Sequence, residues 1–250
     1  MTQVRYSNDA FPPVIKNLVI INLLIWIAQI TLSNRFQLTD MLTVHPIVTE
    51  RLQQALSQMG APDLQKFNPY QLVTYMFAHA AIDENKEIIF GHIFFNMFAI
   101  WMFGRTLENF WGSKRFLIFY LASGIGAGLI HLIVQYIRCE FLLQAIMNNN
   151  QAGIDRYVDA LHPMLGASGA LMGVMAAYAY LFPNTELMII PIPFPIKAKW
   201  LVLGYIGLDL FGGFGTFKND NVAHFTHLGG ALVGFIIVFI WNKTNKRTLY

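Results

Sequence analysis

The sequence predicts an all-α polytopic membrane protein in which six transmembrane helices form one domain, and three observations lead to this fold class. Hydrophobic residues make up 55% of the 250 residues and charged residues only 12%, with a mean hydropathy of +0.46. Apolar runs alternate with polar or proline-containing stretches, and basic residues gather at alternate ends of these runs. A soluble protein of this size needs far more charge to cover its surface, so a water-soluble fold is excluded.

The first apolar run, residues 14–32, matches the ~20 residues that a bilayer core requires. No small-residue cleavage site follows it, so we expect an uncleaved anchor rather than a signal peptide. Residues 34–87 are expected to form a long outer loop. Its stretches 41–59 and 70–81 have an amphipathic pattern, which predicts a structured loop lying at the membrane interface.

The middle of the chain predicts two further spans at residues 88–103 and 116–137. A polar segment, residues 138–162, separates them from the rest of the bundle. Its asparagine-rich run at 148–151 is typical of a loop. This segment is therefore expected to lie outside the membrane.

The last three spans are predicted at residues 164–182, 200–211 and 223–241. Prolines follow the first of them and cannot continue a helix interior. The second is short, and the glycine-rich run at 212–215 is expected to break it. Residues 214–222 would then form a compact loop before the last span.

Basic residues predict the orientation of the chain. One set of span ends carries most of them: Arg5, Lys16, Arg105, Lys114, Arg115, Lys197, Lys199, Lys243, Lys246 and Arg247. The positive-inside rule then places both termini in the cytoplasm, as expected for a protein of the bacterial plasma membrane. The net charge of +3 is scattered singly and builds no basic stripe, so a nucleic-acid partner is not expected.

Six spans with cytoplasmic termini bring three polar side chains to one depth. Spans two, four and six all run from outside to inside, and His92, Ser168 and His227 each lie near the outer end of one of them. Serine is a poor nucleophile unless a base takes its proton, and histidine is the natural base near neutral pH. Ser168 and His227 are therefore the candidate catalytic pair.

Small residues make an approach of the two helices possible. Gly169 and Gly173 form a small face on span four, and Gly230 and Gly234 form one on span six. Such faces let helix backbones pack closely, which would bring Ser168 to the histidine. The alternative is that the glycines are packing motifs only and that Ser168 caps its helix.

Acyl transfer also needs donors for the developing oxyanion. His92 and Asn96 are spaced i, i+4 and share one face of span two, so both side chains are candidate oxyanion donors. The alternative is that this pair joins helices by hydrogen bonds, as polar residues in membranes often do.

Three other polar residues near the span ends are candidates for a metal site or another functional role. His224 lies one turn before His227, but span six carries no carboxylate beside its histidines, so no metal is expected. Asp209 lies near the outer end of span five, and we expect it to anchor the following loop rather than to join a triad. Charge pairing with Arg105 and Arg115 is the expected role of Glu108.

The ordered motifs resemble those of the rhomboid intramembrane serine proteases over residues 68–241. The nucleophile motif is Gly166-Ala167-Ser168-Gly169 with Gly173. The histidine motif is Ala223-His224-x-x-His227-Leu-Gly-Gly230-x-x-x-Gly234. The oxyanion pair is His92-x-x-x-Asn96, and the segment that closes span two is Gly104-x-x-x-Glu108-x-x-Trp111-Gly112. The resemblance implies a six-helix rhomboid-like bundle and a Ser168–His227 dyad without a third acid. It also implies cleavage of transmembrane protein substrates near their outer ends, with no metal and no nucleotide cofactor.

One departure from the family pattern concerns the first loop, where many members carry Trp-Arg and this chain has Tyr70-Gln71.

Two other functions are alternatives to proteolysis. An inactive rhomboid-like protein that binds membrane helices would be expected to lack Ser168 or His227, and both are present. A small transporter or channel would need charged residues or broken helices facing a path near the midplane. Only Asp209 could serve, and it lies too near the surface.

Overall fold

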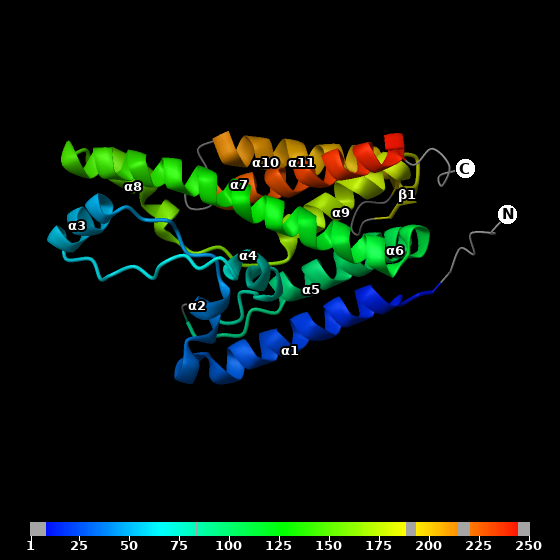
Figure 1. The fold of residues 1–250 in the computed structure, drawn as a ribbon, viewed down its shortest axis with the longest axis horizontal. Coiled ribbons are helices and arrows are strands. Elements are labelled where there is room, and N and C mark those ends of the chain that lie inside the picture. Colours follow the sequence, from blue (N-terminus) through cyan, green and yellow to red (C-terminus); the bar gives the residue numbers. More distant parts are fainter. Residues whose placement is uncertain (1–8, 84, 189–193, 215–220, 245–250) are drawn as a thin grey trace.

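The computed structural model describes residues 9–83, 85–188, 194–214 and 221–244, and most of this chain is helical (Figure 1). The elements of the bundle are, in chain order, α1 (Pro13–Phe36), α5 (Gly91–Ala99), a π-helical turn (Ile100–Gly104), α6 (Arg105–Trp111), α7 (Ser113–Met147), α9 (Ser168–Leu181), α10 (Ala198–Phe214) and α11 (Asn221–Thr244). The smaller elements are α2 (Leu38–Leu42), α3 (Glu50–Gln58), α4 (Gln71–Thr74), a 3-10 turn (Tyr75–Phe77), α8 (Gln151–Tyr157), a second 3-10 turn (Val158–Leu161), β1 (Glu186–Leu187) and β2 (Ile196–Lys197).

The structure is that of a mostly helical membrane protein. Among the described residues, three helices are long and apolar enough to cross a bilayer: Pro13–Leu32, Ser113–Met147 and His224–Thr244. Ser168–Leu181 is a shorter apolar helix. Its 14 residues span only about 21 Å at ~1.5 Å per residue, against a hydrocarbon core of ~30 Å. Helix α9 is therefore too short to cross the hydrocarbon core by itself.

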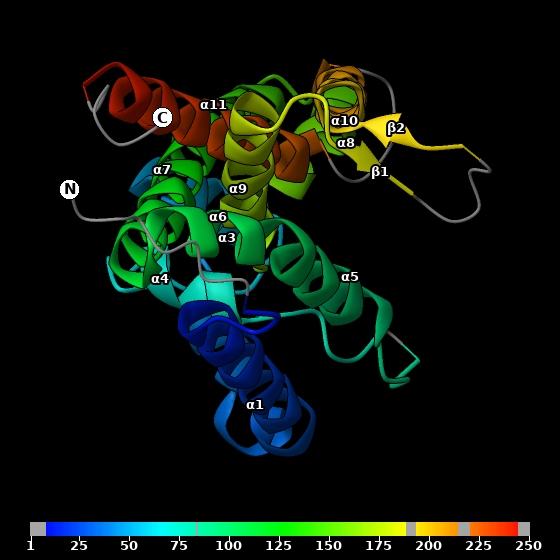
Figure 2. The ribbon, with the colours of Figure 1, turned by 90° about the vertical axis from the view of Figure 1, so that its right-hand side faces the viewer.

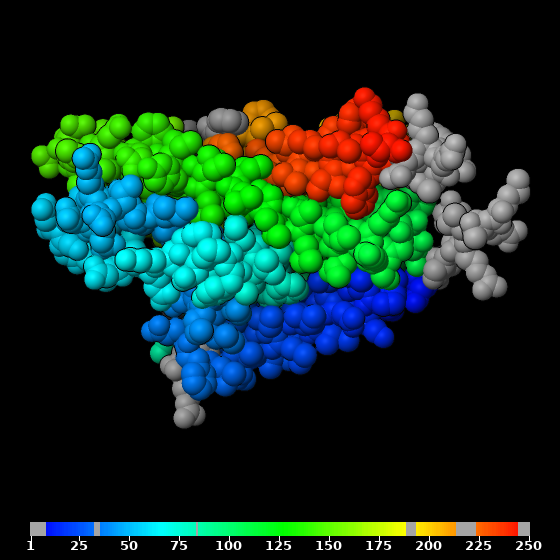
Figure 3. Space-filling model, viewed as in Figure 1, coloured from blue at the N-terminus to red at the C-terminus, as the bar shows by residue number. Residues whose placement is uncertain are grey.

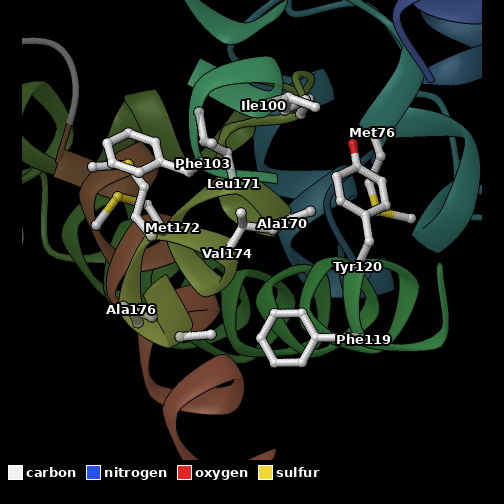
Figure 4. Close-up of a cluster of buried hydrophobic side chains, with 14 of the residues drawn as sticks. Met76, Ile100, Phe103, Phe119, Tyr120, Ala170, Leu171, Met172, Val174 and Ala176 are labelled. Atoms are coloured by element: carbon white, nitrogen blue, oxygen red, sulfur yellow. The ribbon is translucent and has the colours of Figure 1, made fainter. Parts of the chain in front are cut away.

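Helix α9 forms the centre of the bundle, with α7, α10 and α11 around it (Figure 2). Every residue from Gly169 to Tyr178 is buried, so all faces of this part of the helix contact protein. The core around it joins Ala170 and Val174 to Ile100 of the π-helical turn and Phe119 of α7 (Figure 4). Close van der Waals packing holds such a core together, because lipid supplies no hydrophobic drive between membrane helices.

Helix α7 continues to Met147, ten residues beyond the end at residue 137 expected for the third span, so the first part of the polar segment 138–162 is helical. Two contacts keep this end helical. Arg138 forms an ion pair with Asp159 at 2.6 Å. Cys139 and Leu142 pack against Leu52 of α3 in a second buried cluster.

The chain reverses at Asn148–Asn150, as the asparagine run predicted, and Asn150 caps α8 by accepting from the Gly153 N–H at 3.1 Å.

Helix α10 also differs from its prediction. It extends through Gly212 and Gly213 to Phe214, so these glycines do not break it. Gly212 is required for a different reason, because a Cβ at this position would overlap the ring of His224 on α11. Of the predicted loop at 214–222, residues 215–220 lie outside the described residues, and residues 221 and 222 already belong to α11.

The predicted outer loop folds over one end of the bundle, beneath the far end of α7 (Figure 3). Part of it is interior rather than interfacial, because Tyr75 and Met76 are fully buried. The Tyr75 hydroxyl donates to the Gly124 carbonyl of α7 at 2.7 Å. Gln71 is buried too, and its Oε1 accepts from the Asn68 N–H at 3.0 Å. Gln71 therefore anchors this segment.

Two features of the middle of the chain were not predicted. The second span is a composite helix over 91–111 rather than 88–103, and its π-helical turn lets Gly104 approach α1, where a Cβ would lie 2.6 Å from Ile15 Cδ1. The proline-containing segment after α9 holds a short antiparallel pair, in which Glu186 faces Lys197.

Glu108 binds the first turn of α1. Its two carboxylate oxygens accept from the Val14 N–H at 2.9 Å and the Ile15 N–H at 2.8 Å, and the Ser113 hydroxyl donates to it at 2.6 Å. The first N–H groups of a helix have no partner within the helix, and a carboxylate suits the positive end of the helix dipole. Among the described residues Glu108 takes part in no ion pair, so the expected charge pairing is wrong.

We predict that Glu108→Gln lowers the free energy of unfolding by about 1–3 kcal/mol, the cost of leaving a buried, charge-assisted hydrogen-bond partner unmatched. Reversible unfolding in mild detergent measures this change. Glu87→Gln is the matched control, because Glu87 is exposed, and it should leave stability unchanged. Equal stability of the two variants would contradict a capping role for Glu108.

Candidate active site

Ser168 is the first residue of α9, and a glycine with positive φ places it there. Gly166 has φ +117°, a region that side chains disfavour, and its N–H donates to the Tyr75 carbonyl at 2.9 Å. The chain therefore turns sharply just before the helix begins. Ser168 lies at the positive end of the α9 dipole, where backbone N–H groups have no partner within the helix.

His227 of α11 meets Ser168 as the sequence predicted. The distance between His227 Nε2 and Ser168 Oγ is 2.9 Å, which is that of a hydrogen bond. The His227 side chain is 19% exposed, so the pair is partly shielded from the surroundings. This is the geometry that a histidine needs to take a proton from a serine hydroxyl.

The four predicted glycines lie at the contact between α9 and α11. A Cβ at Gly230 would overlap the Gly169 carbonyl oxygen, and one at Gly234 would lie 2.5 Å from Gly173 Cα. The two helix backbones thus touch directly. No other residue type would permit this approach, and the short side chain of Ser168 depends on it to reach α11.

His92 borders the same small space as Ser168. A Cβ at Gly166 would lie 3.2 Å from His92 Nε2 and 3.8 Å from Ser168 Oγ. The Ala80 N–H donates to the other ring nitrogen, His92 Nδ1, at 3.3 Å. In the neutral ring the proton is therefore on Nε2, and His92 presents a donor toward the neighbourhood of Ser168.

Asn96 lies one turn after His92 and is buried. Its amide Nδ2 donates to the His92 carbonyl at 2.8 Å, while its Oδ1 has no partner among the described residues. The carboxamide therefore hydrogen-bonds within its own helix, and no contact places it against Ser168. The predicted pair shares a helix face, but the structure brings only His92 to the serine.

Asp209 is the largest correction to the predicted site. Its Oδ1 lies 3.2 Å from His227 Nδ1 and 2.8 Å from His224 Nδ1. The acid was expected to anchor a loop, yet it contacts both histidines of α11. Span six carries no carboxylate beside these histidines, but α10 supplies one. Ligand atoms of Asp209, His224 and His227 all lie within 4.8 Å of one another, so these three residues could hold a metal ion.

Sequence reasoning missed the groups that orient His92. The Ala80 N–H is a backbone donor in an irregular segment, and no pattern of side chains could have identified it. His79 packs edge-on against His92, with ring centroids 5.2 Å apart. Burial, and secondarily the neighbouring His92, lower the pKa of His79 to about 3. His79 is therefore uncharged beside the site at neutral pH.

The arrangement suits nucleophilic acyl transfer. It provides a hydroxyl, a base in hydrogen-bond contact with it, a ring N–H donor nearby and the open N-terminus of a helix. Those are the components that acyl transfer needs to form and stabilise a tetrahedral intermediate.

Comparison with known proteins identifies relatives of this chain. The "Rhomboid domain" family profile matches residues 66–244. Rhomboid protein 1, mitochondrial, of Saccharomyces cerevisiae is 31% identical over 158 residues, which cover 63% of this chain and 40% of that protein. The human presenilin-associated rhomboid-like protein, mitochondrial, is 33% identical over 159 residues (63% and 35%). Rhomboid protease GluP of Bacillus subtilis is 30% identical over 145 residues (58% and 22%). The chain spans less than half the length of these relatives.

We predict that Gly230→Ala slows labelling of Ser168 by a fluorophosphonate probe about 10²-fold, because the added methyl group separates α9 from α11 and lengthens the Ser168–His227 contact. Gly207→Ala on α10 is the control, since no atom lies within 4 Å of the added methyl group. Unchanged labelling of the Gly230 variant would show that the close helix contact does not set the serine's reactivity.

Proposed function

The chain belongs to the rhomboid family, and on this premise we propose that it is an intramembrane serine endopeptidase that cleaves transmembrane-helix substrates near their outer ends. The observation that carries the proposal is the 2.9 Å contact between Ser168 Oγ and His227 Nε2. A serine hydroxyl in contact with a histidine, at the start of an apolar helix, has the arrangement that nucleophilic catalysis requires. The name of the Bacillus relative, a rhomboid protease, supports the same reaction class.

In the proposed reaction Ser168 Oγ attacks the carbonyl carbon of the substrate peptide bond while its proton passes to His227 Nε2. A C–O bond forms, and the carbonyl electron pair moves to the oxygen. The tetrahedral intermediate then collapses, the C–N bond breaks, and His227 returns the proton to the leaving amine. Water hydrolyses the acyl-enzyme by the same steps, with His227 again as the base.

The negative oxygen of the intermediate needs donors that are already in place. We assign this role to His92 Nε2–H, whose proton position follows from the Ala80 contact, and to the backbone N–H of Ser168. Asn96 would contribute once its carboxamide turns from the His92 carbonyl toward the substrate. Its unpartnered Oδ1 shows that its present hydrogen bonding is incomplete.

The proposed setting is a six-span rhomboid bundle with both termini in the cytoplasm. Helix α1 begins and α11 ends at the same end of the molecule, which agrees with an even number of spans (Figure 1). The positive-inside rule supports the cytoplasmic assignment of this end and, with it, a bacterial plasma membrane. The Ser168 end of α9 then faces outward, so substrates would be transmembrane proteins cut near their outer ends.

We predict that Ser168→Ala and His227→Ala each abolish cleavage of a model transmembrane substrate in proteoliposomes. The two groups act as a unit, so losing either should cost nearly as much as losing both. His224→Ala should keep measurable activity, because His224 does not contact Ser168. A wild-type protein that neither cleaves nor reacts with a fluorophosphonate probe would instead indicate an inactive rhomboid-like protein.

We predict that His92→Ala lowers kcat by about 10²-fold with little change in KM, as expected for an oxyanion donor. Asn96→Ala should act in the same direction. Initial rates on the same substrate measure both effects, with thermal unfolding as the check on folding. Variants that lose stability but keep kcat would assign the pair to helix packing.

A further inference from the structure

We propose that Asp209 is a positioning residue that holds the His227 imidazole for catalysis, so that the site works as a Ser168–His227–Asp209 triad rather than as a dyad. The inference rests on the proposed serine-protease function and deepens it. It departs from the dyad that the family resemblance implies, and it comes from the placement of one buried carboxylate.

The three groups form a continuous chain of contacts through the two nitrogens of one ring. Ser168 Oγ lies 2.9 Å from His227 Nε2, and Asp209 Oδ1 lies 3.2 Å from His227 Nδ1. An ionised carboxylate can only accept hydrogen bonds, so the proton of neutral His227 must be on Nδ1. Nε2 then presents its lone pair to the serine hydroxyl, which is the tautomer that general-base catalysis requires.

Burial strengthens the interaction between the Asp209 carboxylate and the His227 ring. The Asp209 side chain is 5% exposed, and its Oδ2 has no partner among the described residues. A buried carboxylate is costly unless a positive charge or several donors compensate it. When His227 takes the serine proton, the resulting imidazolium lies beside Asp209 and supplies that charge. The contact is therefore stronger after proton transfer than before it, which lowers the barrier to acylation.

His224 shares the same carboxylate oxygen but has a different geometry. Its Nδ1 lies 2.8 Å from Asp209 Oδ1, and its ring fits against Gly212 of α10. This second contact fixes the direction in which the carboxylate points. His224 thus helps to hold Asp209 in place, whereas His227 alone of the two histidines contacts Ser168.

The test compares Asp209→Asn with Asp159→Asn, a control that removes a carboxylate from an ion pair with Arg138. We expect Asp209→Asn to lower kcat on a membrane-embedded substrate by at least about 10²-fold, with KM nearly unchanged, because an amide no longer enforces the Nδ1–H tautomer. The control should keep kcat. A kcat within threefold of wild type for Asp209→Asn at comparable thermal stability overturns the triad.

A second measurement needs no folded Asp209 variant. In ¹⁵N spectra of the wild-type protein, with His227→Gln used to assign the signals, the neutral His227 ring should show a protonated Nδ1 and an unprotonated Nε2. The opposite tautomer overturns the proposal. The proposed function fails separately if the wild-type protein cleaves no transmembrane substrate and Ser168 does not react with the probe, whatever the state of the His227 ring.

Discussion

The direct contact between the backbones of α9 and α11 is the constraint on which the site depends. A serine hydroxyl is only two bonds from its Cα, so a histidine on another helix can reach it only where the two helices nearly touch. Gly230 against the Gly169 carbonyl, and Gly234 against Gly173, provide that approach. In a membrane such contact also supplies the packing that holds the helices together, so stability and reactivity come from the same residues.

Under the proposed function, the short length of α9 would set the depth at which the reaction occurs. Because Gly166 turns the chain at φ +117°, the helix begins at Ser168 and covers only part of the bilayer thickness. The same helix start leaves unpaired N–H groups beside the serine, where a negative oxygen would form. One local feature of the backbone thus fixes how deep the nucleophile lies and what surrounds it.

The sequence predicted those parts of the site that depend on spacing within one helix and on the parity of the spans. These two properties were enough to bring Ser168 and His227 together. The predictions failed where two interacting residues are distant in sequence. Glu108 was expected to pair with nearby arginines, but its carboxylate accepts from the Val14 N–H, 94 positions away. Asp209 could have been found, because spans five and six are expected to be consecutive and antiparallel, and residues near the adjoining ends of such spans lie at similar depth.

In the proposed mechanism His92 and His227 have opposite roles, because groups outside their own helices set the tautomer of each ring. The Ala80 N–H donates to His92 Nδ1, which leaves the His92 Nε2 protonated as a donor. Asp209 accepts from His227 Nδ1, which leaves the His227 Nε2 free as an acceptor. Both Nε2 atoms lie in the surroundings of Ser168, where the proposed mechanism uses one to stabilise negative charge and the other to take a proton. Exchanging either tautomer would present the wrong group to the substrate, so the loop that carries Ala80 and the helix that carries Asp209 both determine the chemistry without touching the serine.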